Sequence, residues 1–181
     1  MSQNTYLAAG ESGSVLSSTD GGLNWIKKPN SFTHGFDDLD FADPLNGFGV
    51  GKDLGVVKTS DGGNTRSLLI EKEYHLFQGV SCIDAMTAFV VEGYGVIRKT
   101  TDAGITWQVR DSTIYADKID FFNTLHGIAI GRNSRILETT DGGMSWIKQE
   151  PVVSNHYYNL HNYDDKRCIV VGAMGAIFKR K

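Results

Sequence analysis

The sequence predicts an all-β fold, a β-propeller of four-stranded antiparallel blades, and three observations support this prediction. First, one eight-residue motif occurs four times, with aspartates at Asp20, Asp61, Asp102 and Asp141, so that the copies follow each other at intervals of 41, 41 and 39 residues. Second, short runs of β-branched residues and glycine-containing turns recur at fixed distances before each copy. Third, the sequence has no stretch with the apolar spacing of a helix. A period near forty residues with four short strands per repeat is typical of a propeller blade.

The repeated motif has the composition of a tight turn. It reads Thr-Thr-Asp-Gly-Gly-Met-Ser-Trp at residues 139–146, and the other copies occupy residues 18–25, 59–66 and 100–107. The Asp can accept hydrogen bonds from the backbone N–H groups that follow it, and the Ser or Thr two positions earlier can bond the same turn. The glycine pair supplies the positive φ that a hairpin turn requires, and only Ala103 interrupts it.

The last residue of the motif is a Trp in three copies and Arg66 in the second copy. A Trp provides a large apolar surface with a single N–H donor, so we expect it to pack between a strand and the neighbouring sheet. The motif therefore assigns a structural role, rather than a catalytic one, to Asp20, Trp25, Asp61, Asp102, Trp107, Asp141 and Trp146.

Each repeat contains four strand-like segments, three before the motif and one after it. The first strand lies around Leu39, Val80, Ile119 and Leu160, which occupy matching positions. The second and third strands flank a short turn, and the segment after the motif supplies the fourth strand. The turns between second and third strands are expected at residues 10–13, 51–54, 92–95, 131–134 and 172–175.

The count of strands predicts five blades, three complete and two incomplete. The second and third strands occur five times, whereas the first and fourth occur four times each. The first blade should therefore lack its inner strand and the last blade its outer strand, within a single domain over residues 1–181. Two alternatives are four blades with residues 1–20 redundant, and pairing between chains through the open sheet edges, which would give a homo-oligomer.

The motif copies resemble the Asp-box, also called the bacterial neuraminidase repeat. With the preceding stretch, as in residues 41–51 and 121–131, the pattern is most similar to photosystem II stability and assembly factor-like proteins. This resemblance implies a β-propeller that binds another macromolecule without catalysis. Asp-box blades also occur in sialidases, other glycosidases and sortilin-type receptors, so the resemblance is specific for fold and weakly specific for function.

Composition and charge exclude several classes of function. The formal charge of −3 and the pI near 5.9 give no indication of nucleic-acid binding. No charged and apolar leader opens the chain, and no membrane segment is indicated. Cys82 and Cys168 occupy non-equivalent repeat positions, which favours reduced thiols and a cytoplasmic location. The five His residues show no metal-ligand spacing, and no cofactor motif is present, so neither a metal nor a cofactor is expected.

Propeller geometry predicts that a binding site lies on the loops around one mouth of the channel. These loops are the connections between second and third strands and those between successive blades. For any single residue, a solvated loop side chain is the simpler interpretation. The set as a whole is a better candidate for a binding site than any one of its members. The residues are Lys52, Asp53, Glu92, Tyr94, Arg132, Asn133 and Arg135 from the first group, and His34, Tyr74, His75, Tyr115, His156 and Tyr157 from the second.

No catalytic residue is predicted. A sialidase would need three arginines that grip a carboxylate, and the arginines here lie at scattered repeat positions. We expect turn chemistry and solvation of strand edges to explain the acidic runs Asp37-Asp38 with Asp40, and Asp164-Asp165. The favoured function is recognition of a protein or other macromolecule through loops. The alternatives are a carbohydrate-binding or glycosidase-like propeller and a structural oligomeric module, such as a viral or phage component.

Overall fold

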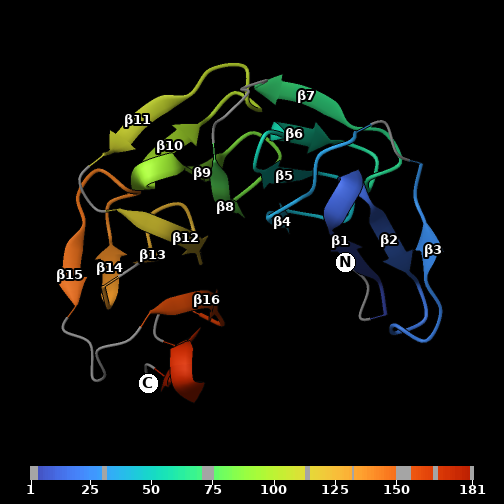
Figure 1. Cartoon of the computed structure of the whole chain (residues 1–181). Helices are drawn as coiled ribbons and strands as arrows, with labels where there is room; N and C mark the ends of the chain where they lie inside the picture. The colour runs from blue at the N-terminus through green and yellow to red at the C-terminus, as the bar shows by residue number, and fades with distance from the viewer. Residues whose placement is uncertain are drawn as a thin grey trace.

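The protein forms five antiparallel sheets that follow one another around an arc (Figure 1). The computed structural model describes residues 4–29, 32–70, 76–112, 115–131, 133–149, 156–164 and 167–179. The first sheet contains β1 (Tyr6–Ala9), β2 (Val15–Ser18) and β3 (Ile26–Lys27); the second contains β4 (Asp38–Phe41), β5 (Gly47–Gly51), β6 (Gly55–Thr59) and β7 (Ser67–Ile70); the third contains β8 (Phe77–Cys82), β9 (Ala88–Glu92), β10 (Val96–Thr100) and β11 (Gln108–Asp111); the fourth contains β12 (Ala116–Phe121), β13 (Gly127–Gly131), β14 (Arg135–Thr139) and β15 (Ile147–Gln149); the fifth contains β16 (Tyr157–Asn162), β17 (Cys168–Gly172) and β18 (Ile177–Lys179).

The three middle sheets have four strands and the two end sheets have three, as the sequence predicts. By repeat position, the first sheet lacks its inner strand and the fifth lacks its outer strand. Residues 6–27 build a sheet of their own, which contradicts the alternative that residues 1–20 are redundant. In Figure 1 the first and fifth sheets lie at the two ends of the arc, on either side of its opening.

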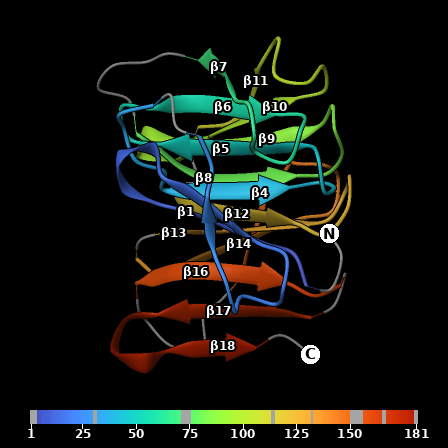
Figure 2. The same ribbon diagram turned by 90° about the vertical axis from the view of Figure 1, so that its right-hand side faces the viewer.

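Strands such as β4, β5, β6, β16 and β17 run across the view in Figure 2, so that the turns at their ends fall on two opposite faces of the molecule. Three turns between second and third strands are short 3-10 turns, η1 (Glu11–Gly13), η2 (Gly93–Gly95) and η3 (Ala173–Gly175). The turns formed by the repeated motif lie at the other end of the third strands. Residues on one turn type therefore share one face of the protein.

The core consists of separate apolar clusters between successive sheets. The second strands β5, β9 and β13 are buried along their whole length because a sheet covers each of their two faces. Between the second and third sheets, for example, Phe48 and Val50 of β5 pack with Phe77 and Val80 of β8. This arrangement explains why the sequence shows short β-branched runs in place of a clear apolar and polar alternation.

Each copy of the repeated motif forms a turn held by its own side chains. In the fourth sheet, Thr139 Oγ1 donates to Asp141 Oδ1 at 2.8 Å and accepts the Gly143 N–H at 2.9 Å, while Asp141 Oδ1 also accepts the Ser145 N–H at 2.9 Å. These hydrogen bonds favour the ionised carboxylate, and with the Ser145 hydroxyl as the largest contribution they lower the pKa of Asp141 to about 2. The other three copies make equivalent bonds through Asp20, Asp61 and Asp102.

Positive φ angles occur at both glycine positions of the motif, including the copy with Ala103, whose φ is 62°. An L-residue pays a small cost in this region, which explains why the other copies use glycine.

The packing of the Trp residues differs between sheets: Trp146 meets Phe121 of its own sheet edge-to-face, with 6.0 Å between ring centres, and Trp25 of the first sheet is 43% exposed. Trp107 of the third sheet meets Phe48 of the second edge-to-face, with 6.1 Å between ring centres, and its indole N–H donates to the Gly104 carbonyl at 3.1 Å. Arg66 occupies the same position in the second sheet, at the border of a small apolar cavity toward the first sheet. Its Nη1 atom is buried and has no hydrogen-bond partner within the residues that the structure describes.

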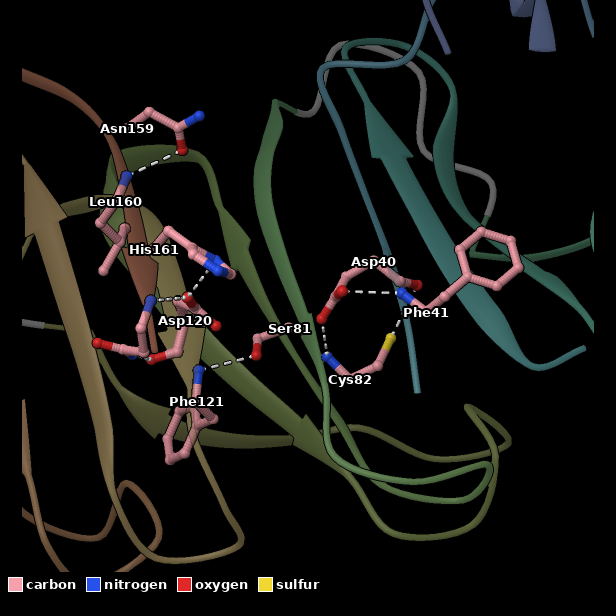
Figure 3. Close-up of polar contacts among 10 residues, drawn as sticks. Asp40, Phe41, Ser81, Cys82, Asp120, Phe121, Asn159, Leu160 and His161 are labelled. Atoms are coloured by element: carbon pink, nitrogen blue, oxygen red, sulfur yellow. Dashed lines mark hydrogen bonds and ion pairs between the residues drawn. The ribbon is translucent and has the colours of Figure 1, made fainter. Parts of the chain in front are cut away.

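Side chains on the inner strands join neighbouring sheets, and Figure 3 shows these contacts. In each case a polar side chain on one inner strand accepts a backbone N–H from the inner strand of the next sheet. The pairs are Asp40 Oδ2 with the Cys82 N–H at 2.7 Å, Ser81 Oγ with the Phe121 N–H at 2.9 Å, and Asp120 Oδ2 with the Asn162 N–H at 2.7 Å.

The expectation that Asp38 and Asp40 serve turns or solvated edges is therefore wrong. Both lie on β4, where their carboxylates face the third sheet, and burial raises the pKa of both. Lys118 Nζ lies 3.1 Å from Asp38 Oδ2 and offsets part of the cost of burying that charge. Asp164, in contrast, does serve a turn, since its Oδ1 accepts the Arg167 N–H at 2.8 Å.

Candidate functional site

One position in the turn between second and third strands has a left-handed backbone in all five sheets. A residue other than glycine occupies it each time, although this conformation costs such residues about 1 kcal/mol or more. The side chains at this position differ strongly between sheets, from a small hydroxyl to an aromatic ring, so they have no common packing role. All five lie on the same face of the protein. The residues and their φ angles are Ser12 at 53°, Asp53 at 57°, Tyr94 at 62°, Asn133 at 58° and Met174 at 53°.

On this face a groove of about 930 Å³ lies between the third and fourth sheets. Its walls come from the β9–β10 and β13–β14 turns and from the starts of the inner strands β8 and β12. We call it the rim groove, and it lies within the size range of ligand sites in proteins. Its lining residues are Leu76, Gln78, Glu92, Gly93, Tyr94, Val96, Arg98, Tyr115, Ala116, Asp117, Asn133 and Arg135.

Two exposed tyrosines and an arginine line the rim groove. Tyr94 is 89% exposed and stands at the tip of its turn. The Arg135 guanidinium lies over the Tyr115 ring, 4.8 Å from the ring centre, which is the geometry of a cation–π contact. Tyr115 itself has a positive φ of 49°. Two tyrosines of the groove therefore have a backbone conformation that residues other than glycine rarely adopt.

The charges inside the groove are balanced. Glu92 is buried and forms an ion pair with the Arg98 side chain across the β9–β10 turn. Asp117 at the start of β12 lies 3.9 Å from His156 Nε2, which approaches from the fifth sheet. The groove therefore offers hydrogen-bonding and aromatic surface to a ligand without a strong net charge.

The structure brings five of the predicted site residues together in the rim groove, namely Glu92, Tyr94, Asn133, Arg135 and Tyr115. Lys52 and Asp53 lie on the corresponding turn of the second sheet, outside the groove, and His34 is exposed in the connection that precedes β4. His156 contacts Asp117 at its edge. Arg132, His75 and Tyr74 lie outside the residues that the structure describes.

The prediction for Tyr157 is wrong. We expected a loop residue at the channel mouth, but Tyr157 begins β16 and is only 1% exposed. Its ring packs against Ile130 and Ile136 of the fourth sheet, and this burial raises the pKa of the Tyr157 hydroxyl. A register shift between Tyr157 and Asn159 separates it from its exposed neighbour Tyr158.

Sequence reasoning missed Gln78, Arg98 and Asp117, which line the groove from within strands. A signal for Arg98 was present, because the equivalent third-strand position is apolar as Leu16, Val57 and Leu137 in the other repeats. A charged residue at an otherwise apolar repeat position indicates a local reason, and here that reason is the ion pair with Glu92.

No cluster of three or more His, Cys, Asp or Glu side chains that could hold a metal occurs among the described residues. In the same part of the chain, no helix is both long enough and apolar enough to cross a membrane. Cys82 and Cys168 form no disulfide, and the Cys82 thiol donates to the Asp40 carbonyl at 3.1 Å.

Comparison with known proteins shows similarity at the level of three-dimensional structure. No protein-family model matches this chain, and no curated protein matches it by sequence. A structure of YCF48 from Cyanidioschyzon merolae is similar over 98% of this chain and 63% of its own, with a TM-score of 0.77 and 17% identity. A structure of YCF48 bound to a D1 peptide is similar over 80% of this chain and 49% of its own, with a TM-score of 0.64 and 22% identity.

Glycoside hydrolases of family GH74 are structural neighbours as well. The GH74 enzyme from Niastella koreensis is similar over 98% of this chain and 34% of its own, with a TM-score of 0.75 and 16% identity. This chain thus spans 63% or less of these neighbours. At identities this low the similarities establish the fold alone, and they confirm the propeller-type architecture that the sequence predicts.

Proposed function

We propose that this protein is a non-enzymatic recognition module that binds a segment of another protein in the rim groove. The observation that carries this proposal is the convergence of Tyr94, Tyr115 and Arg135 on one groove, held by turns with unfavourable backbone angles. Exposed tyrosines and a stacked arginine are the residue types that contribute most to protein interfaces. Strands of the third and fourth sheets flank both turns, so that the turns lose little conformational freedom when a ligand binds.

The carboxylates of the groove support binding rather than hydrolysis. A glycosidase needs one carboxyl group as a proton donor and a second as nucleophile or base. Glu92 is buried in an ion pair with Arg98, so this carboxylate is already engaged by a side chain of the protein. The existence of a YCF48 structure with a bound peptide agrees with a peptide ligand for a protein of this fold.

Carbohydrate binding is the second candidate. Exposed tyrosine rings at Tyr94 and Tyr115, with the amide side chains of Gln78 and Asn133 nearby, would also suit the flat faces and hydroxyl groups of a sugar. The GH74 neighbours provide a reason to test this class directly.

A selection from a phage-displayed random peptide library, followed by calorimetry with the selected peptides, tests the first candidate. We expect peptides that lose more than about tenfold in affinity with Arg135→Ala and with Tyr94→Ala, since each change removes a central contact. The matched control is Met174→Ala, which changes the same turn position in the fifth sheet, where the side chain is 99% exposed.

Selected peptides that bind all three variants equally would contradict the assignment to the rim groove. A parallel glycan array measures the second candidate, and glycan binding sensitive to the same two substitutions, without any selected peptide, would replace the first candidate by the second.

A further inference from the structure

The fifth sheet has one covered face and one exposed face. Toward the fourth sheet it presents Tyr157 and Leu160 of β16 with Cys168 and Val170 of β17. These side chains cover the isoleucines of the fourth sheet, of which Ile130 is 0% and Ile136 is 3% exposed. This contact is one member of the series of sheet-to-sheet interfaces that builds the arc.

The exposed face of the fifth sheet repeats the apolar surface that the fourth sheet buries. By repeat position, Ile169, Val171 and Ile177 correspond to Ile128, Ile130 and Ile136. Val171 and Ile177 are register partners on neighbouring strands, so their side chains lie on one face. Yet Val171 is 38% exposed and Ile177 is 72% exposed. We call this surface the fifth-sheet face.

The first sheet exposes a surface that corresponds to the other side of this interface, the side by which the fifth sheet covers the fourth. Tyr6 and Ala8 of β1 occupy the repeat positions of Cys168 and Val170, the two second-strand residues that cover the fourth sheet. Tyr6 is 48% exposed, and Leu16, the register partner of Ala8, is 36% exposed. We call this surface the first-sheet face.

The other side of the first sheet is already used. Leu7, Ala9 and Val15 line the small cavity toward the second sheet, together with Leu39 and Phe48. The first-sheet face is therefore the side of β1 and β2 that points away from the rest of the arc.

Within one molecule the two faces do not meet, because the first and fifth sheets lie at the two ends of the arc (Figure 1). We propose that the fifth-sheet face binds the first-sheet face of a second copy of this chain, head to tail, as a continuation of the interfaces inside the arc. A second copy fits the fifth-sheet face because its first sheet carries Tyr6 and Ala8 at the repeat positions of Cys168 and Val170, the residues that cover the fourth sheet within one molecule. An interface of this type is heterologous, so that each copy keeps one face available for a further copy.

The experiment measures the mass of the full chain by sedimentation velocity over about a hundred-fold range of concentration. We expect the average mass to rise with concentration. Ile177→Glu and Leu16→Glu should each weaken this association more than about tenfold, because a carboxylate would be placed without a partner in an apolar contact. Ile105→Glu is the matched control, since Ile105 is 80% exposed in the middle sheet, away from both faces.

Mixing the two variants separates this arrangement from other modes of association. Ile177→Glu retains an intact first-sheet face and Leu16→Glu retains an intact fifth-sheet face. A head-to-tail contact therefore predicts that an equimolar mixture forms one-to-one dimers, although each variant alone stays monomeric. Association of Leu16→Glu alone at the level of the unchanged chain would overturn the proposal, as would a monomeric unchanged chain at every concentration. Circular dichroism spectra of all variants establish that each is folded.

Discussion

Replacing Asp120 by Asn should stabilise the protein at neutral pH, although the side chain accepts a hydrogen bond that joins two sheets. Asp120 Oδ2 accepts the Asn162 N–H at 2.7 Å, and its side chain is 24% exposed. Burial, followed by the repulsion from the Asp40 carboxylate, raises the pKa of Asp120 to about 6 from an ordinary value of 3.8. His161 Nδ1 at 3.7 Å from Asp120 Oδ2 opposes this shift.

A raised pKa means that the folded protein binds the proton of Asp120 more tightly than the unfolded chain does. The resulting stabilisation is complete below pH 3.8 and is lost as the pH rises through about 6. A difference of about two pKa units corresponds to roughly 3 kcal/mol as an upper value. Asn retains a carbonyl acceptor for the Asn162 N–H and removes the charge. We therefore expect the Asn variant to gain about 1–3 kcal/mol in unfolding free energy at pH 7.5 and nothing below pH 4.

Urea denaturation followed by tryptophan fluorescence across this pH range measures the difference between the two proteins. A gain that does not change with pH, or a loss at pH 7.5, would refute the reasoning. Asp141→Asn is the matched control, since hydrogen bonds within its turn lower the pKa of Asp141 to about 2. A lowered pKa gives the opposite sign. The stabilisation from Asp141 is present above pH 3.8 and is lost as the pH falls through about 2, so Asp141→Asn should destabilise the protein at pH 7.5 and lose its effect in acid.

Three further substitutions test the contacts between sheets by the same denaturation assay. Arg66→Trp should stabilise by about 1–2 kcal/mol, because a Trp here can fill the apolar cavity and donate to the Gly63 carbonyl, and a net loss would contradict this. Trp107→Ala should cost about 2–4 kcal/mol and Trp25→Ala, whose ring is 43% exposed in the first sheet, about 1 kcal/mol or less; equal losses would exclude the proposed packing. Ser81→Ala should cost about 1–3 kcal/mol because the Phe121 N–H loses its acceptor, and an unchanged stability would indicate that this bond contributes nothing.

The parts of the fold that could be predicted from the sequence depend on local signals. The turns around Asp20, Asp61, Asp102 and Asp141 are formed by residues within five positions of each other, so the sequence alone specifies their bonds. The number and order of strands follow from counting these turns. For the same reason Tyr94 and Asn133 could be located, because a variable residue inside a regular turn is visible without knowledge of distant contacts.

The remaining features depend on which sheet lies next to which. Asp40 and Asp120 serve the following sheet through residues about forty positions away, so their neighbours in sequence suggest only solvated carboxylates. Tyr157 is buried because β16 packs on the fourth sheet, although its sequence neighbours resemble a loop. Asp117 lines the rim groove from within a strand, where sequence reasoning did not search for a site.

Hydrogen–deuterium exchange with a peptide selected for binding tests the central claim most directly, that one groove between the third and fourth sheets is the recognition site. The account predicts that bound peptide slows exchange in residues 92–98, 115–117 and 133–135, on both sides of the rim groove, and leaves the corresponding turns at residues 10–13 and 172–175 unchanged. Slowed exchange confined to another face, or spread equally over all five sheets, would contradict it.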